Sequence, residues 1–505
     1  MNKAAAADIG LSKAALKFEN NTTTMYRVHM RTMKYIYLIT AIWCGTALIS
    51  HAQQAKVDSI YHFTLQDCIN YAYQHQDSVV NANLDVKSSE YRVKEITGQG
   101  LPQISGSASF QDYLKTPSIL FPNFISAPIY QILNSEGVKN GSGQTISATP
   151  PGGTATEQSV SLYQTYNASA GLAVSQIIFD GSYLVGLKAS KTYRELSQRN
   201  YTRSRIQANI DVTKAYYQVL VSNEQIRLLD ANINQVKQQM DQTVQQNKQG
   251  FVEKIDVDRI TVQYNNLIAN RENTLRLLNL NAQLLKFQMG MPIQDSVVLK
   301  DRLEDVNMNA DAGETVQDTA FYHNRIEYNL GEINVRLNEL SLKNTRSQYF
   351  PKLSAVGNTS LTYQDNSFGQ LFSTSYPATY VGLNLSVPIF SGGQRLNQVR
   401  ESKITLLKSQ NDLDNLKNAL NLQASKARIS YVNGINTLNV QKQNQALAQE
   451  VLRVARIKYQ QGVGSSIEVT QAETDLVNAD NQYIQGLYEA LISKVDLDQA
   501  YGRIK

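Results

Sequence analysis

The strongest clue to the fold is a pair of similar stretches, Gln249-Gly250-Phe251-Val252-Glu253-Lys254-Ile255-Asp256-Val257 and Gln461-Gly462-Val463-Gly464-Ser465-Ser466-Ile467-Glu468-Val469. In each, a glycine follows a long helical pattern, and a second helical pattern begins a few residues later. Glycine ends a helix readily because it adopts the left-handed conformation at little cost. Ser465 or Ser466 can cap the helix that follows. These stretches are therefore predicted to be the turns of two helical hairpins.

The residues before each turn predict a very long helix. Proline is absent from 152–291, 293–350 and 389–505. Apolar side chains in 186–249 and 397–461 recur at coiled-coil spacing. Each of these two tracts has about 65 residues, which corresponds to a helix roughly 100 Å long at 1.5 Å per residue. An ordinary globular core does not need helices of this length.

Equal spacings predict that the chain contains two copies of one unit. The glycines Gly250 and Gly462 are 212 residues apart, and Phe179-Asp180-Gly181 and Phe390-Ser391-Gly392 are 211 apart. Pro102 and Pro351 are 249 residues apart, so the first copy has 38 extra residues between its proline and its Phe-x-Gly. These extra residues predict a long loop at 114–160. The expected copies are 53–316 and 317–505.

Between the proline and the Phe-x-Gly of each copy, apolar and polar residues alternate. The alternating segments are 104–111, 166–175, 352–364 and 379–390, and they predict strands with one apolar and one polar face. Each copy is thus expected to run helix, strand, loop, strand, very long helix, tip and helix. Four strands cannot close a barrel alone, because small barrels need about eight, and open edges in lipid would stay unpaired. The chain is therefore predicted to oligomerise.

Residues 1–52 are predicted to be a leader, in which 33–52 form a secretory signal peptide. A basic start is followed by an apolar stretch and by Ser50-His51-Ala52, which suits a cleavage site. A retained anchor is the alternative. The leader carries six of the 48 basic and two of the 43 acidic residues, so 42 and 41 remain without it. This balance gives no reason to expect a nucleic-acid partner.

The sequence gives no sign of catalysis or of a cofactor. After the leader the histidines are His62, His75 and His323, and their spacing does not suit a metal ion. Phosphate-binding, dinucleotide-binding and Gly-x-Ser-x-Gly motifs are not found. Cys68 is the one cysteine that remains, so an intrachain disulfide is not expected. The protein is predicted not to be an enzyme.

The duplicated pattern resembles the TolC family of outer-membrane efflux proteins over nearly all of the chain after the leader. Val387-Pro388-Ile389-Phe390-Ser391-Gly392-Gly393-Gln394-Arg395 looks like the strand-to-helix motif of that family, and Val174–Gly181 is its looser partner. Thr64–Ile69 resembles the opening helix. The junction residues that carry the resemblance are Phe179, Gly181, Pro388, Phe390, Gly392 and Gly393.

The resemblance implies a mixed α and β membrane protein that acts as a homotrimer in a Gram-negative cell. Four strands from each chain would form a twelve-stranded β-barrel in outer-membrane lipid, continued by a long α-helical barrel in the periplasm. A belt would draw on 292–318 and the C-terminus. The protein would be a passive exit duct of a tripartite efflux or type I secretion system. Its partners would be a periplasmic adaptor and an inner-membrane pump.

The resemblance also implies roles for residues at the tips. The adaptor would dock at Gly250, Phe251, Gly462, Val463 and Gly464. Asp256 and Tyr459 would help to latch the tunnel shut, and Glu468 would belong to an acidic ring that narrows the pore. Two positions depart from the family, because its latching arginine falls on Gly464 and the second acid of its ring falls on Gln471.

Purely structural roles for the same residues, and other classes of protein, are alternative interpretations. Glu468 suits the first turn of any helix because the helix dipole favours an acid there. Tyr459 suits coiled-coil packing, and the two tip glycines suit a plain helix stop. A soluble periplasmic coiled-coil scaffold would explain the helices but not the duplicated strands, and a single-chain porin would need more than four strands. The long loop is predicted to lie at the extracellular end of the barrel, because it joins two strands, and a loop folded inward as a plug is the alternative. The cargo does not follow from the sequence.

Overall fold

The computed structural model describes residues 60–122, 126–151, 157–161, 163–303 and 321–505. The predicted leader and signal peptide lie outside the described residues, as does most of the predicted belt segment 292–318. Tyr61–Ile293 and Val297–Lys505 form one compact unit, which holds the elements that matter here. Ile60 and Gln294–Ser296 are the described residues of a second unit.

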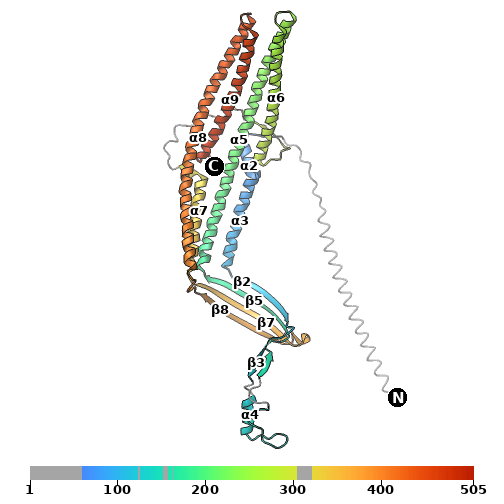
Figure 1. Ribbon diagram of the computed structural model, residues 1–505, viewed down its shortest axis with the longest axis vertical. Coiled ribbons are helices and arrows are strands. Elements are labelled where there is room, and N and C mark those ends of the chain that lie inside the picture. The colour runs from blue at the N-terminus through green and yellow to red at the C-terminus, as the bar shows by residue number, and fades with distance from the viewer. Residues whose placement is uncertain (1–59, 123–125, 152–156, 162, 304–320) are drawn as a thin grey trace, which may run out of the picture. The chain divides into compact units, whose positions relative to one another are not determined.

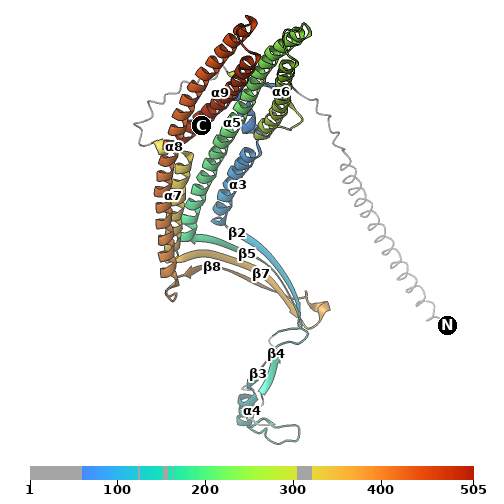
Figure 2. The same ribbon diagram turned by 45° about the horizontal axis from the view of Figure 1, so that its top comes forward.

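A four-stranded antiparallel sheet occupies one part of the larger unit (Figures 1 and 2). Its strands follow the order β2 (Gln103–Asp112), β5 (Tyr166–Phe179), β7 (Lys352–Asp365) and β8 (Ser375–Ser386). The two central strands come from different predicted copies of the repeat. The outer edges of β2 and β8 have no partner strand among the described residues.

The register gives the sheet one apolar and one polar face. Val174 of β5 lies opposite Ile104 of β2 and Gly357 of β7, and Gly357 lies opposite Val381 of β8. The apolar face carries Ile104, Ala108, Phe110, Ala168, Ala170, Leu172, Val174, Leu361, Val381 and Leu383. The polar face carries Ser105, Ser107, Ser109, Asn167, Ser169, Asn358, Ser360, Thr362 and Asn384. This arrangement agrees with the alternation in the sequence.

The last strand is shorter at its end than the sequence predicts. A strand was expected over 379–390, whereas β8 ends at Ser386. Ser386 is paired with Lys352, the first residue of β7, so the ladder has no further residue to pair with. Pro388 also lacks the N–H that a ladder needs. Val387 to Phe390 therefore connect the sheet to the next helix.

Each strand of the sheet is connected directly along the chain to one long helix. The four helices that adjoin the strands are α3 (Asp77–Gln99), α5 (Gly181–Lys248), α7 (Ile326–Ser347) and α8 (Gln394–Gln460). They contact one another in the order α3, α5, α7, α8, which is the order of β2, β5, β7 and β8. The edges of the helical layer and of the sheet therefore lie on the same two sides.

Two helical hairpins form the other end of the unit (Figure 1). We call α5 with α6 (Lys254–Met289) the first hairpin, and α8 with α9 (Ser466–Ala500) the second hairpin. The helices α5 and α8 have 68 and 67 residues, which agrees with the predicted length of about 100 Å. None of the helices in the described part of the chain has an apolar stretch that would cross a membrane.

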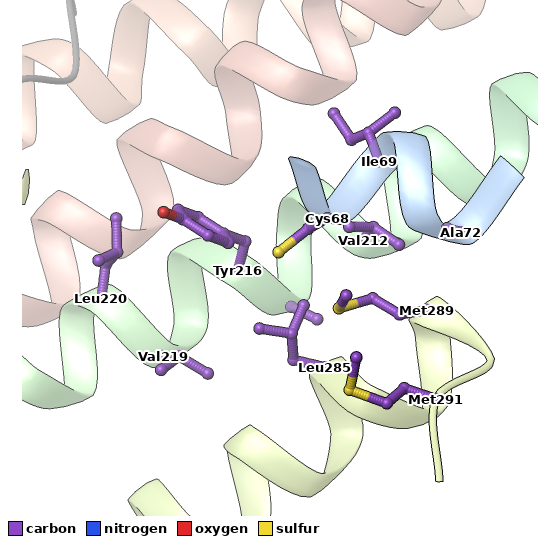
Figure 3. Packing of buried hydrophobic residues seen from close by; sticks show 11 residues of the cluster. Cys68, Ile69, Ala72, Val212, Tyr216, Val219, Leu220, Leu285, Met289 and Met291 are labelled. Atoms are coloured by element: carbon purple, nitrogen blue, oxygen red, sulfur yellow. The ribbon is translucent and has the colours of Figure 1, made fainter. Parts of the chain in front are cut away.

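The largest buried cluster lies where α2 (Leu65–His75) packs on α5 and α6 (Figure 3). Cys68, Tyr216, Leu285 and Met289 are almost fully buried there. The Tyr216 hydroxyl donates a hydrogen bond of 2.7 Å to Asp301, so its buried polar group is satisfied. Burial raises the pKa of the Cys68 thiol to about 12, which keeps it protonated and inert. This cluster joins the opening helix to the first hairpin.

The segment predicted as a long loop contains regular structure. Between β2 and β5 the chain forms β3 (Ser118–Pro122), α4 (Ser126–Ser135) and β4 (Glu157–Ser161), and β3 pairs with β4. In α4 the half-buried Tyr130 and Leu133 share one face, which is a helical spacing that composition alone did not reveal. Since β2 begins at α3 and β5 leads into α5, the insertion emerges at the strand ends away from the helices.

Candidate functional site

Glycines in the left-handed conformation form both hairpin tips. Gly250 has φ 80° and Gly462 has φ 73°, and both lie in open space. The amides of Phe251 and Val463 close the turns on Gln246 and Lys458. The side chains of Phe251 and Val463 are 78% and 77% exposed. Each tip therefore presents an exposed apolar side chain at its turn.

Gly464 has no room for a side chain. A Cβ atom there would lie 2.9 Å from Lys458 Cβ and 3.0 Å from the Tyr459 amide nitrogen. Because the turn packs this residue against the end of α8, an arginine would not fit without movement of the turn. The turn therefore has no room at this position for the arginine that the family resemblance implies.

The first turn of α9 contains the predicted constriction residue. The Ser465 hydroxyl, rather than that of Ser466, accepts the Glu468 amide and caps the helix. Glu468 is exposed and lies at a groove of about 570 Å³ between α8 and α9. Gln471, at the position of the second expected acid, donates to Asp475 at 2.9 Å. The position of Glu468 suits both a pore acid and an ordinary helix N-terminus, so its role stays a prediction.

The two predicted latch residues each bond to the other hairpin. The Tyr459 hydroxyl donates to Gln246 Oε1 at 3.4 Å, and the Ser466 hydroxyl donates to Asp256 Oδ1. Burial, and to a lesser extent the negative charge of the nearby Asp256, raise the pKa of Tyr459. We call these four residues, Gln246, Asp256, Tyr459 and Ser466, the tip clasp. Sequence reasoning missed Gln246 and considered Ser466 only as a cap.

A buried ion pair lies further from the tip inside the second hairpin. Arg456 of α8 donates to Glu473 Oε1 of α9 at 2.9 Å, and Glu473 is only 2% exposed. Its second oxygen, Oε2, is buried without a hydrogen-bond partner. Burial raises the pKa of Glu473, and the nearby Arg456 opposes that shift only in part. The charged form of this carboxyl therefore destabilises the folded chain relative to its protonated form.

Acidification is expected to stabilise the protein through Glu473. The unfolded carboxyl titrates near its ordinary value of 4.5, and the folded one titrates at higher pH. Between these two values the folded state binds more protons, so the free energy of unfolding increases as the pH falls through this window. Melting temperatures of the wild type and of Glu473→Gln should therefore diverge in favour of the wild type below the folded pKa. Glu489→Gln, an exposed change on the same helix, should show no such divergence, and a pH-independent difference for Glu473→Gln would contradict the assignment.

The first strand-to-helix junction is tightly packed. Phe179 ends β5, Asp180 caps α5 by accepting the Ser182 amide at 2.8 Å, and Gly181 begins the helix. A Cβ at Gly181 would lie 3.1 Å from Ser347 Cβ, so the absence of a side chain allows α5 to approach the end of α7. Asp180 also forms an ion pair of 3.0 Å with Lys352 of β7.

The second junction is more open. Pro388 and Phe390 follow β8, and Phe390 is 88% exposed. Gly392 and Gly393 have φ 57° and 78°, and Gly393 stands at the N-cap of α8 without a side-chain cap. Exposed aromatic residues at the border between sheet and helices suit a membrane–water interface.

In the described part of the chain, His, Cys, Asp and Glu form no group that would hold a metal ion.

Known proteins share this sequence pattern. A model of the protein family described as outer membrane efflux protein matches residues 148–283 and 331–503. The chain is 23% identical over 349 residues to the outer membrane protein TolC of Salmonella enteritidis, covering 66% of this chain and 69% of that protein. It is 22% identical over 325 residues to the alkaline protease secretion protein AprF of Pseudomonas aeruginosa, covering 63% and 66%.

Solved structures share the fold. A membrane protein from Pseudomonas aeruginosa superimposes with a TM-score of 0.67 at 14% identity, covering 87% of this chain and 92% of that chain. The outer membrane protein VceC of Vibrio cholerae superimposes with a TM-score of 0.63 at 14% identity, covering 87% and 96%. At 14% identity these superpositions show a shared fold. The match to the family model is what shows the evolutionary relationship.

Proposed function

Because the chain belongs to the outer membrane efflux protein family, we propose that three copies of it assemble into one passive exit duct. The protein is an outer-membrane channel component of efflux and secretion, and it extends into the periplasm. The threefold assembly, the partners at the tips and the cargo go beyond the family assignment.

The matching edges of sheet and helices are the observation that supports assembly most strongly. The strand order ends at β2 and β8, and the helical layer ends at α3 and α8 on the same sides. A second copy can therefore continue both layers at once, by placing its β2 and α3 beside β8 and α8. Four strands fall short of the about eight that a barrel needs, and the resemblance to the family supplies the number of three chains.

The two faces of the sheet suit a barrel in lipid. The apolar face, which includes Val381 and Leu383, would contact outer-membrane lipid, and the Ser- and Asn-rich face would line the lumen. The alternative function is a soluble periplasmic scaffold. A scaffold would leave this apolar face exposed to water. In the duct, the insertion with α4 would lie at the outer end of the barrel, since it joins the strand ends away from the helices.

The hairpin tips would receive a periplasmic adaptor and, through it, an inner-membrane pump. The bare side chains of Phe251 and Val463 support this role, and the glycines beside them set the shape of each tip. The relative from Pseudomonas aeruginosa is named for protease secretion. The cargo of this chain would be selected by its pump, because a passive duct need not bind what it conducts.

Gly462→Leu is expected to reduce export at least about fivefold while the amount of membrane-bound trimer stays close to that of the wild type. The leucine would project into open space at the tip, where the adaptor would dock, and would strain the left-handed turn. Export from cells and trimer on a gel measure the two effects. Gly143→Leu is the matched control, since Gly143 also has positive φ and open space but lies in the insertion. Equal export by the two variants would count against docking at this tip.

A further inference from the structure

The two hairpins meet along one seam, which α9 of the second hairpin forms with α5 and, to a lesser extent, with α6. In the half of the seam away from the tips, one apolar cluster is shared by both hairpins. It joins Val221 of α5 to Leu438 of α8 and to Ile484, Leu487 and Leu491 of α9. We call it the shared cluster. Apolar burial therefore fixes the hairpins to each other in this half.

Toward the tips the apolar cores separate. One cluster belongs to the first hairpin and consists of Leu229, Ile233, Val236, Ile260 and Leu267. Another belongs to the second hairpin and consists of Leu452, Ala455, Val469, Ala472 and Leu476. Among the described residues, the half-buried Val477 of α9 is the one apolar side chain of the second hairpin that packs on the first of these clusters. In this half, apolar burial holds each hairpin together more than it holds the two hairpins to each other.

A buried carboxylate stands where the seam changes from apolar to polar. Asp480 of α9 is 6% exposed and lies one helical turn from Ile484 of the shared cluster. Asn232 Nδ2 of α5 donates to its Oδ2 at 2.7 Å, and Gln445 Nε2 of α8 donates to its Oδ1 at 2.8 Å. One side chain thus joins three helices from both hairpins. The bond to Asn232 is the one that crosses the seam.

The chemistry of this contact makes the seam easy to open. Hydrogen bonds to a carboxylate are strong, but both donors here are neutral amides, and water can take the place of either of them. If the tip half of the second hairpin swings away, Asp480 loses Asn232 and gains water. An apolar pair at the same place would gain nothing from water, so it would keep the seam closed.

We infer that Asp480 is the positioning residue of the seam: with Asn232 it holds the second hairpin closed, through a polar contact that water can replace when the seam opens around the shared cluster. The inference rests on the proposed duct. It assigns the pivot to Ile484, Leu487 and Leu491, and it places the moving part between Asp480 and the tip clasp.

The test compares opposite changes at one contact in purified trimers placed in planar lipid bilayers. Asn232→Ala leaves the buried carboxylate with one unpaired oxygen, so the mean current through the duct should rise at least about tenfold. The double variant Asn232→Leu with Asp480→Leu extends the shared cluster by one layer, so its current should fall below that of the wild type. Asn234→Ala is the control, because it removes an exposed amide from the same helix.

A purely structural role predicts a different pattern, namely lower melting temperatures with unchanged currents. Currents equal to the wild type in both seam variants would overturn the inference. If the Asn232→Ala protein fails to assemble, the double leucine variant tests the inference alone. A current through that variant that is not lower than the wild-type current would overturn the inference. A wild-type protein that forms no trimer and passes no current would instead count against the proposed duct.

Discussion

Val381→Arg is expected to lower the amount of trimer in the outer membrane at least about tenfold. Val381 lies near the middle of β8, on the apolar face, and its side chain is 88% exposed in the single chain. An arginine at the bilayer midplane costs about 2–4 kcal/mol, and each trimer would carry three of them. Heat-sensitive trimer bands from isolated outer membranes measure the effect.

Tyr380→Arg is the matched control for this prediction. Tyr380 is the preceding residue of the same strand, pairs with Asn358, and lies on the polar face. An arginine there would project into the water-filled lumen, so the trimer should persist. If both variants assembled equally well, the apolar face would not be the lipid-facing side of a barrel.

The second large effect is expected at the tip clasp. Asp256→Ala combined with Tyr459→Phe removes both bonds that join the hairpins there, one of them to a charged group. Such bonds contribute about 0.5–1.5 kcal/mol each, and about 1.5–3 kcal/mol where one partner is charged. Since about 1.4 kcal/mol changes an equilibrium tenfold, the current through purified trimers should rise at least about tenfold.

Asp258→Ala gives the control for the clasp, because it removes an exposed acid two residues further along α6. Its current should match that of the wild type. A double clasp variant with the wild-type current, in a trimer of unchanged melting temperature, would show that Asp256 and Tyr459 only pack the hairpins. The alternative reading of Tyr459 as a coiled-coil residue would then hold.

Local patterns were sufficient to predict most of the architecture. The alternation around Val174 and Val381 reports directly which face of a strand is apolar, and the register confirms it. The glycines at 250 and 462 predict the tips because a left-handed residue ends a helix whatever surrounds it. The predicted end of β8 was wrong, because a strand ends where its partner strand begins. The sequence of β8 itself does not contain the position at which β7 begins.

The parts of the site that depend on tertiary contacts could not be predicted. Gln246 and Ser466 acquire their partners from residues more than 200 positions away, once the hairpins lie side by side. Asp480 looks in the sequence like any acid on a helix, where a solvated surface is the usual role. Its burial becomes visible only when α5 and α8 cover the same face of α9.

The mass of the protein extracted from membranes in mild detergent tests the central claim most directly. The proposed duct predicts a particle of three chains that is found only in the membrane fraction, because the free edges of β2 and β8 close by threefold assembly. A monomer or dimer that stays in solution without detergent would contradict it. The sheet would then not be part of a barrel, and a periplasmic scaffold would be the better account.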